Sequence, residues 1–154
     1  MQAMENNLAF LFMDTARLFR KKFAEAARSF GGTGPQWRAL LVLEKNPGIN
    51  QGMLAEHLDV EPITACRMVD RLEQAGLVER RRDPADRRVW QLFVTESAAP
   101  VVGNLRAVGG GLIERAASAL SPEEAESLKV MITRVRDNLA SMEDGMEIDE
   151  AANG

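Results

Sequence analysis

The chain has very little of the chemistry that builds disulfide frameworks or metal sites. Its 154 residues include one cysteine, Cys66, and one histidine, His57. A single cysteine excludes a disulfide within the chain, and one cysteine with one histidine does not make an intrachain zinc site. One imidazole without a partner nucleophile also makes no catalytic triad. We therefore expect no metal and no cofactor.

Long apolar runs and the usual catalytic motifs are also absent. The apolar stretch 8–13 is far too short to span a membrane, and no basic segment precedes it as in a signal peptide. The sequence has no Gly-x-Gly-x-x-Gly, no phosphate-binding loop, no His-Glu-x-x-His and no nucleophile with an evident base. These absences predict a cytoplasmic protein that is not an enzyme and does not bind membranes.

The charges of the chain are unevenly distributed. The formal net charge is -4, but residues 143–154 hold five acids and no base, which leaves +1 for the rest. Segment 80–88 has five arginines against two aspartates, and segment 17–28 has five bases against one glutamate. Because local charge decides contact with a polyanion, this distribution allows nucleic-acid binding despite the acidic total.

Apolar spacing and capping residues predict six helices and one hairpin. The first helix covers about residues 5–30, and a Thr33/Gln36 capping box opens the second, which runs through Leu43. The third is short and capped by Asn50, the fourth runs from Pro62 to Gly76, the fifth follows Thr95 as its cap and extends to Leu120, and the sixth runs from a box at Ser121 to Met142. The hairpin strands are expected at 77–82 and 89–94.

The last two predicted helices each have a feature with a structural consequence. The fifth helix should continue across residues 109–111, three glycines that indicate either a kink or the close approach of another helix. The sixth helix has a seam that a lone helix should not expose and that suits a dimer interface: Leu128, Ile132, Val135, Leu139 and Met142.

This order of elements predicts a mainly α (α+β) fold, a winged helix-turn-helix. We expect a DNA-binding lobe in residues 33–95, one helical segment before it in 1–32, two helices after it in 96–142 and a disordered acidic tail in 143–154. A winged helix-turn-helix places one helix in the major groove of DNA and a hairpin on the adjacent backbone.

The fourth helix separates into two faces on a helical wheel. Ala65, Val69 and Leu72 share the side that we expect to be core. The candidate DNA-facing residues are Ile63, Thr64, Arg67, Arg71 and Gln74. Arg67 could bind guanine O6 and N7 through two donors, and Thr64 could bind a phosphate or a base edge. The alternative is that Arg67 and Arg71 only solvate the helix and pair with its own acids, Asp70 or Glu73.

The hairpin tip, residues 83–86, has turn chemistry in its aspartates and proline. Such a turn can hold Arg87 and Arg88 outward. We expect Asp86 to pair with one of the arginines, which leaves another free to enter a narrow minor groove of negative potential. Two alternatives remain open: the hairpin is only a solubilised sheet edge, or it grips an acidic protein partner.

Three segments carry a resemblance to a known family: Leu54-Ala55-Glu56-His57-Leu58, Thr64-x-x-Arg67-x-x-Asp70-Arg71-Leu72-Glu73-x-x-Gly76-Leu77-Val78-Glu79-Arg80, and Asp83-Pro84-x-Asp86-Arg87-Arg88 with Val94-Thr95. Over about residues 8–142 the chain resembles the MarR family of bacterial transcription regulators, with the SlyA-like branch nearest. The resemblance implies a homodimeric winged helix with N- and C-terminal dimerisation helices, here residues 1–32 and 96–142. It further implies binding of double-stranded DNA at a pseudo-palindromic operator. It also implies a repressor released by a small, often anionic aromatic ligand or by thiol oxidation.

By this resemblance, Arg88 matches the wing arginine that enters the minor groove, while Thr64 and Arg67 match recognition-helix positions. An aromatic carboxylate effector is expected between the dimer helices and the DNA-binding lobe, where the candidate lining residues are Phe19, Trp37, Arg17 and Arg38. The alternative for these residues is plain core packing. Cys66 is interpreted either as a packed small residue or as a thiol whose oxidation blocks DNA contact.

Overall fold

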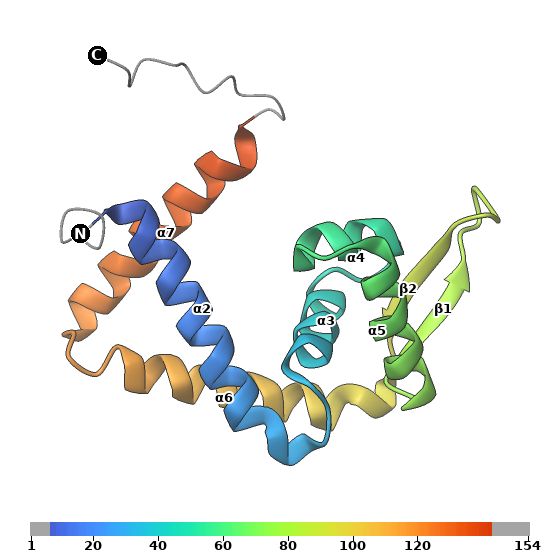
Figure 1. Cartoon of the computed structure of the whole chain (residues 1–154), viewed down its shortest axis with the longest axis horizontal. Coiled ribbons are helices and arrows are strands. Elements are labelled where there is room, and N and C mark those ends of the chain that lie inside the picture. Colours follow the sequence, from blue (N-terminus) through green and yellow to red (C-terminus); the bar gives the residue numbers. More distant parts are fainter. Residues whose placement is uncertain (1–6, 143–154) are drawn as a thin grey trace. The chain divides into compact units, whose positions relative to one another are not determined.

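The computed structural model describes residues 7–142. The chain divides into two compact units, residues 1–113 and residues 114–154. The first unit contains α2 (Leu8–Ala26), a 3₁₀ turn (Ala27–Phe30), α3 (Gly34–Lys45), α4 (Gln51–Leu58), α5 (Pro62–Gln74), β1 (Val78–Arg82), β2 (Trp90–Val94), a second 3₁₀ turn (Glu96–Ala98) and most of α6 (Ala99–Ala116). Figure 1 shows the hairpin of β1 and β2 projecting beside α5. The expected acidic tail, 143–154, lies outside the described residues.

The first helix is shorter than the sequence indicated. Asn7 caps α2 by accepting a hydrogen bond from the Ala9 amide, and the helix ends at Ala26. A tighter 3₁₀ turn then continues to Phe30 and closes at Gly31, whose φ of 86° suits glycine. Apolar spacing alone does not distinguish this last turn from α-helix, so the prediction of one helix to residue 30 was wrong there.

The helix-turn-helix forms where the capping residues predict it. Thr33 and Gln36 make the reciprocal capping box that opens α3, and the Asn50 side chain accepts from the Met53 amide to open α4. Asp59 has the left-handed φ of 53° that turns the chain after α4, and Pro62 is the first residue of α5. Local hydrogen bonds thus fix the bend between α4 and α5.

One apolar core supports the helices and the hairpin. Its largest fully buried side chains are Leu40, Leu43, Leu54, Val69, Val78, Leu92 and Leu105, which come from α3, α4, α5, both strands and α6. The predicted inner face of α5 is confirmed, because Ala65, Val69 and Leu72 are buried. Burying each large side chain stabilises the fold by roughly 1.5–3 kcal/mol, so this core fixes the orientation of α5.

The hairpin is an antiparallel ladder in which Arg80 lies opposite Leu92 and Arg82 opposite Trp90. Its outer edge on the β2 side is also occupied, because Leu92 exchanges backbone hydrogen bonds with Gly48 and Ile49, at 2.9 and 3.0 Å. Both strands are one residue shorter than expected, beginning at Val78 and Trp90. Backbone hydrogen bonds at Leu92 therefore join the hairpin to the segment between α3 and α4.

Thr95 has a different role from the predicted one. It makes no side-chain cap for the following helix. Its hydroxyl instead donates to the Gly76 carbonyl at 2.6 Å, and the Ser97 hydroxyl donates to the same carbonyl at 3.0 Å. Gly76 has a φ of 74°, so this contact joins the left-handed end of α5 to the end of β2. The two hydroxyls close the base of the hairpin.

The glycine run does not interrupt α6, which is continuous from Ala99 to Ala116 and ends four residues before the predicted Leu120. A Cβ added at Gly109 would lie 3.9 Å from Phe23, an ordinary contact. Added Cβ atoms at Gly110 and Gly111 would meet nothing within 4 Å among the described residues. Intrachain packing of this part of the chain therefore gives no reason for the glycines.

In the second unit, α7 (Pro122–Ser141) begins with the predicted capping box between Ser121 and Glu124. It has no buried residue, and its seam is exposed. No helix in residues 7–142 is long and apolar enough to cross a membrane.

Gly34 should tolerate no larger side chain. A Cβ added there would lie 2.6 Å from the Ala24 Cβ, so Gly34→Ala should force α2 and α3 apart and lower the free energy of unfolding by about 1–3 kcal/mol. Gly103→Ala is the matched control, because nothing lies within 4 Å and alanine favours a helix by up to about 1 kcal/mol. Urea denaturation at one protein concentration measures both. A Gly34→Ala variant as stable as the wild type would contradict the described packing of α2 on α3.

Candidate nucleic-acid interface

The outer surface of α5 is open to solvent. Ile63, at its first turn, is 61% exposed although it is apolar, and Thr64, Arg67, Arg71 and Gln74 are exposed as well. Because the opposite face is held by the core, these side chains point away from the body of the unit. All five α5 residues that the sequence suggested for DNA contact therefore lie on accessible surface.

The acidic residues of α5 do not pair with its exposed arginines. Nη2 of Arg80, on β1, donates to Oδ1 of Asp70 at 2.6 Å, and Nη1 donates to Oε1 of Glu73 at 2.9 Å. The alternative in which Arg67 and Arg71 pair with Asp70 or Glu73 is therefore wrong. Neither arginine makes a side-chain hydrogen bond or ion pair within residues 7–142.

Arg80 is the most enclosed member of the hairpin's arginine cluster. Its side chain is only 16% exposed and also reaches Oε1 of Gln51, the first residue of α4, at 3.4 Å. Burial by itself lowers the pKa of Arg80, but the Asp70 hydrogen bond and the charges of Glu73 and Asp70 outweigh it and raise that pKa above its ordinary value. Sequence reasoning included Arg80 in the basic cluster and missed this bridging position.

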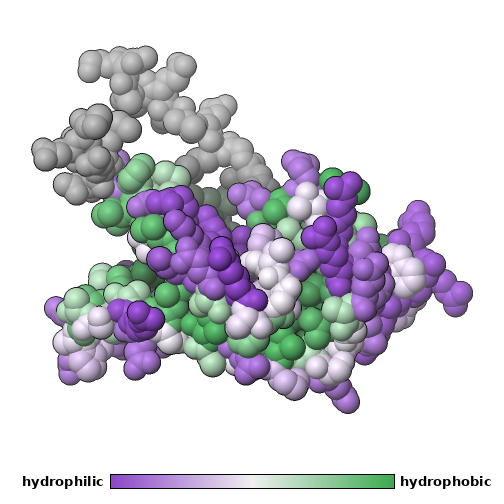
Figure 2. Space-filling view, turned by 60° about the horizontal axis from the view of Figure 1, so that its bottom comes forward, coloured by the Kyte–Doolittle hydropathy of each residue, from purple (hydrophilic) through white to green (hydrophobic). Residues whose placement is uncertain are grey.

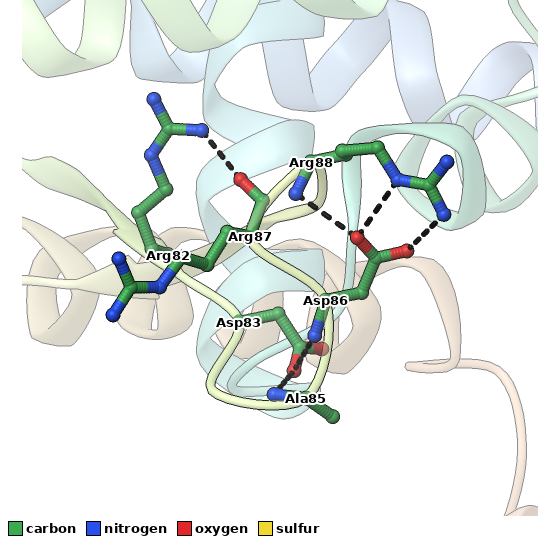
Figure 3. A network of polar contacts seen from close by, with 6 residues as sticks. All are labelled: Arg82, Asp83, Ala85, Asp86, Arg87 and Arg88. Atoms are coloured by element: carbon green, nitrogen blue, oxygen red, sulfur yellow. Dashed lines mark hydrogen bonds and ion pairs between the residues drawn. The ribbon is translucent and has the colours of Figure 1, made fainter.

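The hairpin tip is built around one carboxylate. Oδ1 of Asp83 accepts from the backbone amide of Ala85 at 2.7 Å and from that of Asp86 at 3.4 Å (Figure 3). Its other oxygen accepts from Nε2 of Gln91 at 3.3 Å, on the opposite strand. The predicted aspartate turn is thus present, and it fixes the path of the chain into Arg87 and Arg88.

Asp86 pairs with Arg88, as the sequence suggested for one of the arginines. The carboxylate accepts from Nε at 3.0 Å, from Nη2 at 3.1 Å and from the Arg88 backbone amide at 3.1 Å (Figure 3). The hydrogen bond from the Arg88 side chain, followed by that from its amide, holds the pKa of Asp86 below its ordinary value. Arg88 nevertheless keeps 89% of its side chain exposed, so the pair orients its guanidinium without covering it.

Arg81 and Arg82 are held against aromatic rings. The Arg81 guanidinium lies 4.3 Å from the centre of the Phe93 ring, and that of Arg82 lies 4.1 Å from the Trp90 ring. Arg82 also donates to the backbone carbonyl of Arg87 (Figure 3). The Arg87 side chain makes no hydrogen bond or ion pair among the described residues. It is therefore the one hairpin arginine in this part of the chain whose charge is neither paired nor stacked.

Hydrophilic side chains cover the hairpin end of the first unit, at the right of Figure 2. The elements at this end carry four exposed arginines: Arg67 and Arg71 on α5, and Arg87 and Arg88 at the hairpin tip. Arg80 pairs with both acids of α5, whose side chains keep 50% (Asp70) and 44% (Glu73) of their surface exposed.

The candidate effector residues are dispersed over α2 and α3. Trp37 is buried, and its indole Nε1 has no hydrogen-bond partner among the described residues. Phe19 is half-buried and stacks on Phe23 with ring centres 6.4 Å apart. Arg17 is exposed and bonded to Asp14 at 2.6 Å on its own helix.

Arg38 is half-buried on α3 and makes no ion pair among residues 7–142. Burial lowers the pKa of its guanidinium, the positive charge of Arg20 lowers it further, and Asp59 partly opposes both effects. Cys66 is half-buried on α5, and His57 is exposed in the last turn of α4.

A tight helix-turn-helix whose second helix, α5, is exposed and is followed by a basic hairpin defines a winged helix-turn-helix protein. Residues 33–90 match the model of the MarR family. The chain is 35% identical over 107 residues to the uncharacterised HTH-type transcriptional regulator YybA of Bacillus subtilis (strain 168), covering 70% of this chain and 71% of the relative. The chain belongs to the MarR family and has the fold of a transcriptional regulator.

Two solved structures show the same fold. The transcriptional repressor CouR bound to a 23-mer DNA duplex superposes with a TM-score of 0.71 at 24% identity, over 86% of this chain and 94% of that one. The MarR family protein Rv2887 of Mycobacterium tuberculosis in complex with salicylic acid superposes with a TM-score of 0.73 at 23% identity, over 86% and 98%.

Proposed function

We propose that this protein is a dimeric, sequence-specific DNA-binding repressor of transcription. The observation that supports this proposal most directly is that the arginines on α5 have no charge partner within the described residues. Arg67 and Arg71 are exposed and unpaired within the described residues, while the acids beside them are bound by Arg80. Opposite charges three or four residues apart stabilise a helix by pairing, yet Asp70, three residues after Arg67, is bonded to Arg80 instead, so Arg67 is left available to an external polyanion.

In this proposal α5 enters the major groove. Arg67 is placed to bind guanine O6 and N7 with two donors, and the exposed apolar side chain of Ile63 suits a thymine methyl group. Thr64, Arg71 and Gln74 flank them and are assigned to phosphates or base edges. The superposition on CouR, which was solved with a DNA duplex, supports this use of the fold.

The hairpin is assigned to the DNA backbone and the minor groove. Arg88 is oriented outward by Asp86, and Arg87 beside it carries an unpaired charge in the described part of the chain. A narrow minor groove concentrates negative potential and attracts an arginine without reading a particular base. The hairpin should therefore contribute affinity, and α5 should contribute the sequence preference.

These two roles predict different outcomes for two arginines. Arg67→Ala should cost about 1–3 kcal/mol on a preferred duplex and relax the preference at one base position in each half-site. Arg88→Ala should weaken preferred and scrambled duplexes together and reduce the salt slope by about one for each phosphate that the variant no longer neutralises. Fluorescence anisotropy over a salt series measures both variants on a duplex selected by the wild type and on its scrambled counterpart.

The opposite pattern would reverse the assignment, with Arg88→Ala leaving the salt slope unchanged and Arg67→Ala weakening both duplexes equally. A wild type that binds both duplexes only weakly, or without preference, would favour the alternative in which the arginine hairpin grips an acidic protein.

We infer that the terminal helices form a homodimer. The seam of α7 is exposed along its whole length, and α2 exposes Leu8, Phe10, Leu11, Phe12, Met13 and Leu18. Monomeric proteins rarely leave apolar stripes of this kind in water, and a two-fold dimer would bury them on both copies. A dimer would also place two copies of α5 in successive major grooves.

Truncation tests this interface. Removal of residues 122–154 should abolish the dimer and binding to the selected duplex, because it deletes the α7 seam. Removal of residues 145–154 is the matched control and should preserve both. Sedimentation velocity measures the oligomeric state, and a stable dimer in the longer truncation would contradict the proposed interface.

We further propose that an aromatic carboxylate releases the protein from DNA, as the solved complex of the similar Rv2887 with salicylic acid suggests. Within this chain the proposal rests on Arg38, which is half-buried without an ion pair in the described residues and lies near the like charge of Arg20. Trp37 adds a buried indole N–H that has no partner in the same part of the chain. A bound carboxylate would reduce the repulsion between these two positive charges.

Salicylate should raise the melting temperature of the wild type and weaken its binding to the selected duplex, with about 2.7 kcal/mol of stabilisation at a hundred times its Kd. Arg38→Gln should lose both responses, and Arg17→Gln should weaken them less, because Arg17 is exposed and already bonded to Asp14. The effector proposal fails if no phenolic or carboxylate compound changes the melting temperature or the affinity for the selected duplex. If a thiol oxidant does change them, the result favours regulation through oxidation of Cys66.

A further inference from the structure

Arg80 connects three elements of the DNA-binding lobe through one guanidinium. It lies on β1 and bonds to Asp70 and Glu73 of α5 and to Gln51 of α4. Its own backbone amide also donates to Oε2 of Glu73 at 3.2 Å. The hairpin and α5 are thus joined by side-chain bonds as well as by the core.

The low exposure of Arg80 argues against a phosphate contact of its own. Only 16% of the side chain is accessible, against 50% for Asp70 and 44% for Glu73. One positive charge is shared between two negative ones that lie at the surface from which Arg67 and Arg71 project. Both carboxylates are therefore bonded to one guanidinium of the hairpin, and neither is bonded to an arginine of α5.

The spacing of α5 shows what the acids would do without this partner. Asp70 lies three residues after Arg67, which is the spacing of an intrahelical ion pair. Glu73 has no basic residue three or four positions away on either side. Without Arg80, Asp70 would pair with Arg67, and Glu73 would be left as an unpaired negative charge facing phosphates.

We propose that Arg80 is a positioning residue for DNA recognition, which holds Asp70 and Glu73 so that Arg67 and Arg71 stay free to bind DNA. The inference rests on the proposed function, because it concerns the same surface. It assigns Arg80 no base or phosphate contact. Its effect on DNA binding passes through the carboxylates, and through Asp70 in particular.

A double-mutant cycle tests this role. Arg80→Met keeps the aliphatic stem and releases the acids, so affinity for the duplex selected by the wild type should fall at least roughly tenfold, as expected for an unmasked like charge at an interface. Asp70→Asn added to Arg80→Met should restore most of that affinity. Asp70→Asn alone should change affinity by no more than about twofold, because the remaining amide oxygen can still accept from Arg80.

Arg82→Met is the matched control. Arg82 lies two residues further along β1, carries the same charge and bonds to no carboxylate. Adding Asp70→Asn to Arg82→Met should give the same small effect as in the wild type. Where Arg80→Met does not fold, as judged by circular dichroism, Arg80→Lys replaces it in the same cycle, because a single ammonium cannot reproduce the fork that holds both acids.

The inference is supported if Asp70→Asn raises DNA affinity markedly in the Arg80→Met variant but changes it little in the wild type and in Arg82→Met. The inference is overturned if Asp70→Asn changes affinity by the same factor in all backgrounds, or if the folded Arg80 variant binds the selected duplex as tightly as the wild type. In both cases the wild type still prefers the selected duplex and the proposed function stands. A wild type with no preference for any duplex would overturn the proposed function and this inference together.

Discussion

The apolar core beneath α5 is the constraint on which the other features depend. Val69 and the buried face around it share one apolar core with leucines from α3, α4, β2 and α6, so α5 has one orientation relative to the hairpin. Truncating a leucine in such a core typically costs about 2–5 kcal/mol, far more than any exposed ion pair contributes. Packing therefore decides which side of α5 meets solvent, and electrostatics acts only on the side that packing leaves open.

The arginines of α5 and the hairpin fall into groups according to what each guanidinium contacts. Arg80 is enclosed by acids, and Arg81 and Arg82 lie over aromatic rings. Arg67 and Arg87 make no side-chain hydrogen bonds within residues 7–142. The total charge of the segment is thus a poor guide to the charge that DNA would meet, because the environment of each guanidinium determines whether it is available.

Features that depend on neighbours in sequence were predictable. Capping residues indicated the starts of α3, α4 and α7, and Pro62 indicated that of α5. Helical spacing indicated the inner face of α5, and the aspartates indicated the hairpin turn. In each case the partners lie within about four residues, so the physical cause is visible in a short window of sequence. The family and its fold were identified for the same reason, since the motif residues are contiguous.

Features that depend on contacts distant in sequence were not predictable. The Arg80 bridge joins residues 51, 70, 73 and 80, and its existence follows only when the core sets α5 beside β1. Thr95 bonds to Gly76 rather than capping a helix, because the hairpin returns its hydroxyl to within 2.6 Å of that carbonyl. The dimer interface, the DNA-contact residues and the effector residues stay predictions, since they concern contacts beyond one chain. The assignment to the SlyA-like branch also stays a prediction.

The central claim is that two copies of α5 read DNA sequence together. Selection by the wild-type protein from a randomised duplex library tests it most directly. We predict enrichment of a pseudo-palindrome whose half-site centres lie about one helical turn, roughly 10 bp, apart. Enrichment of no sequence, or of a single unpaired half-site, would contradict it.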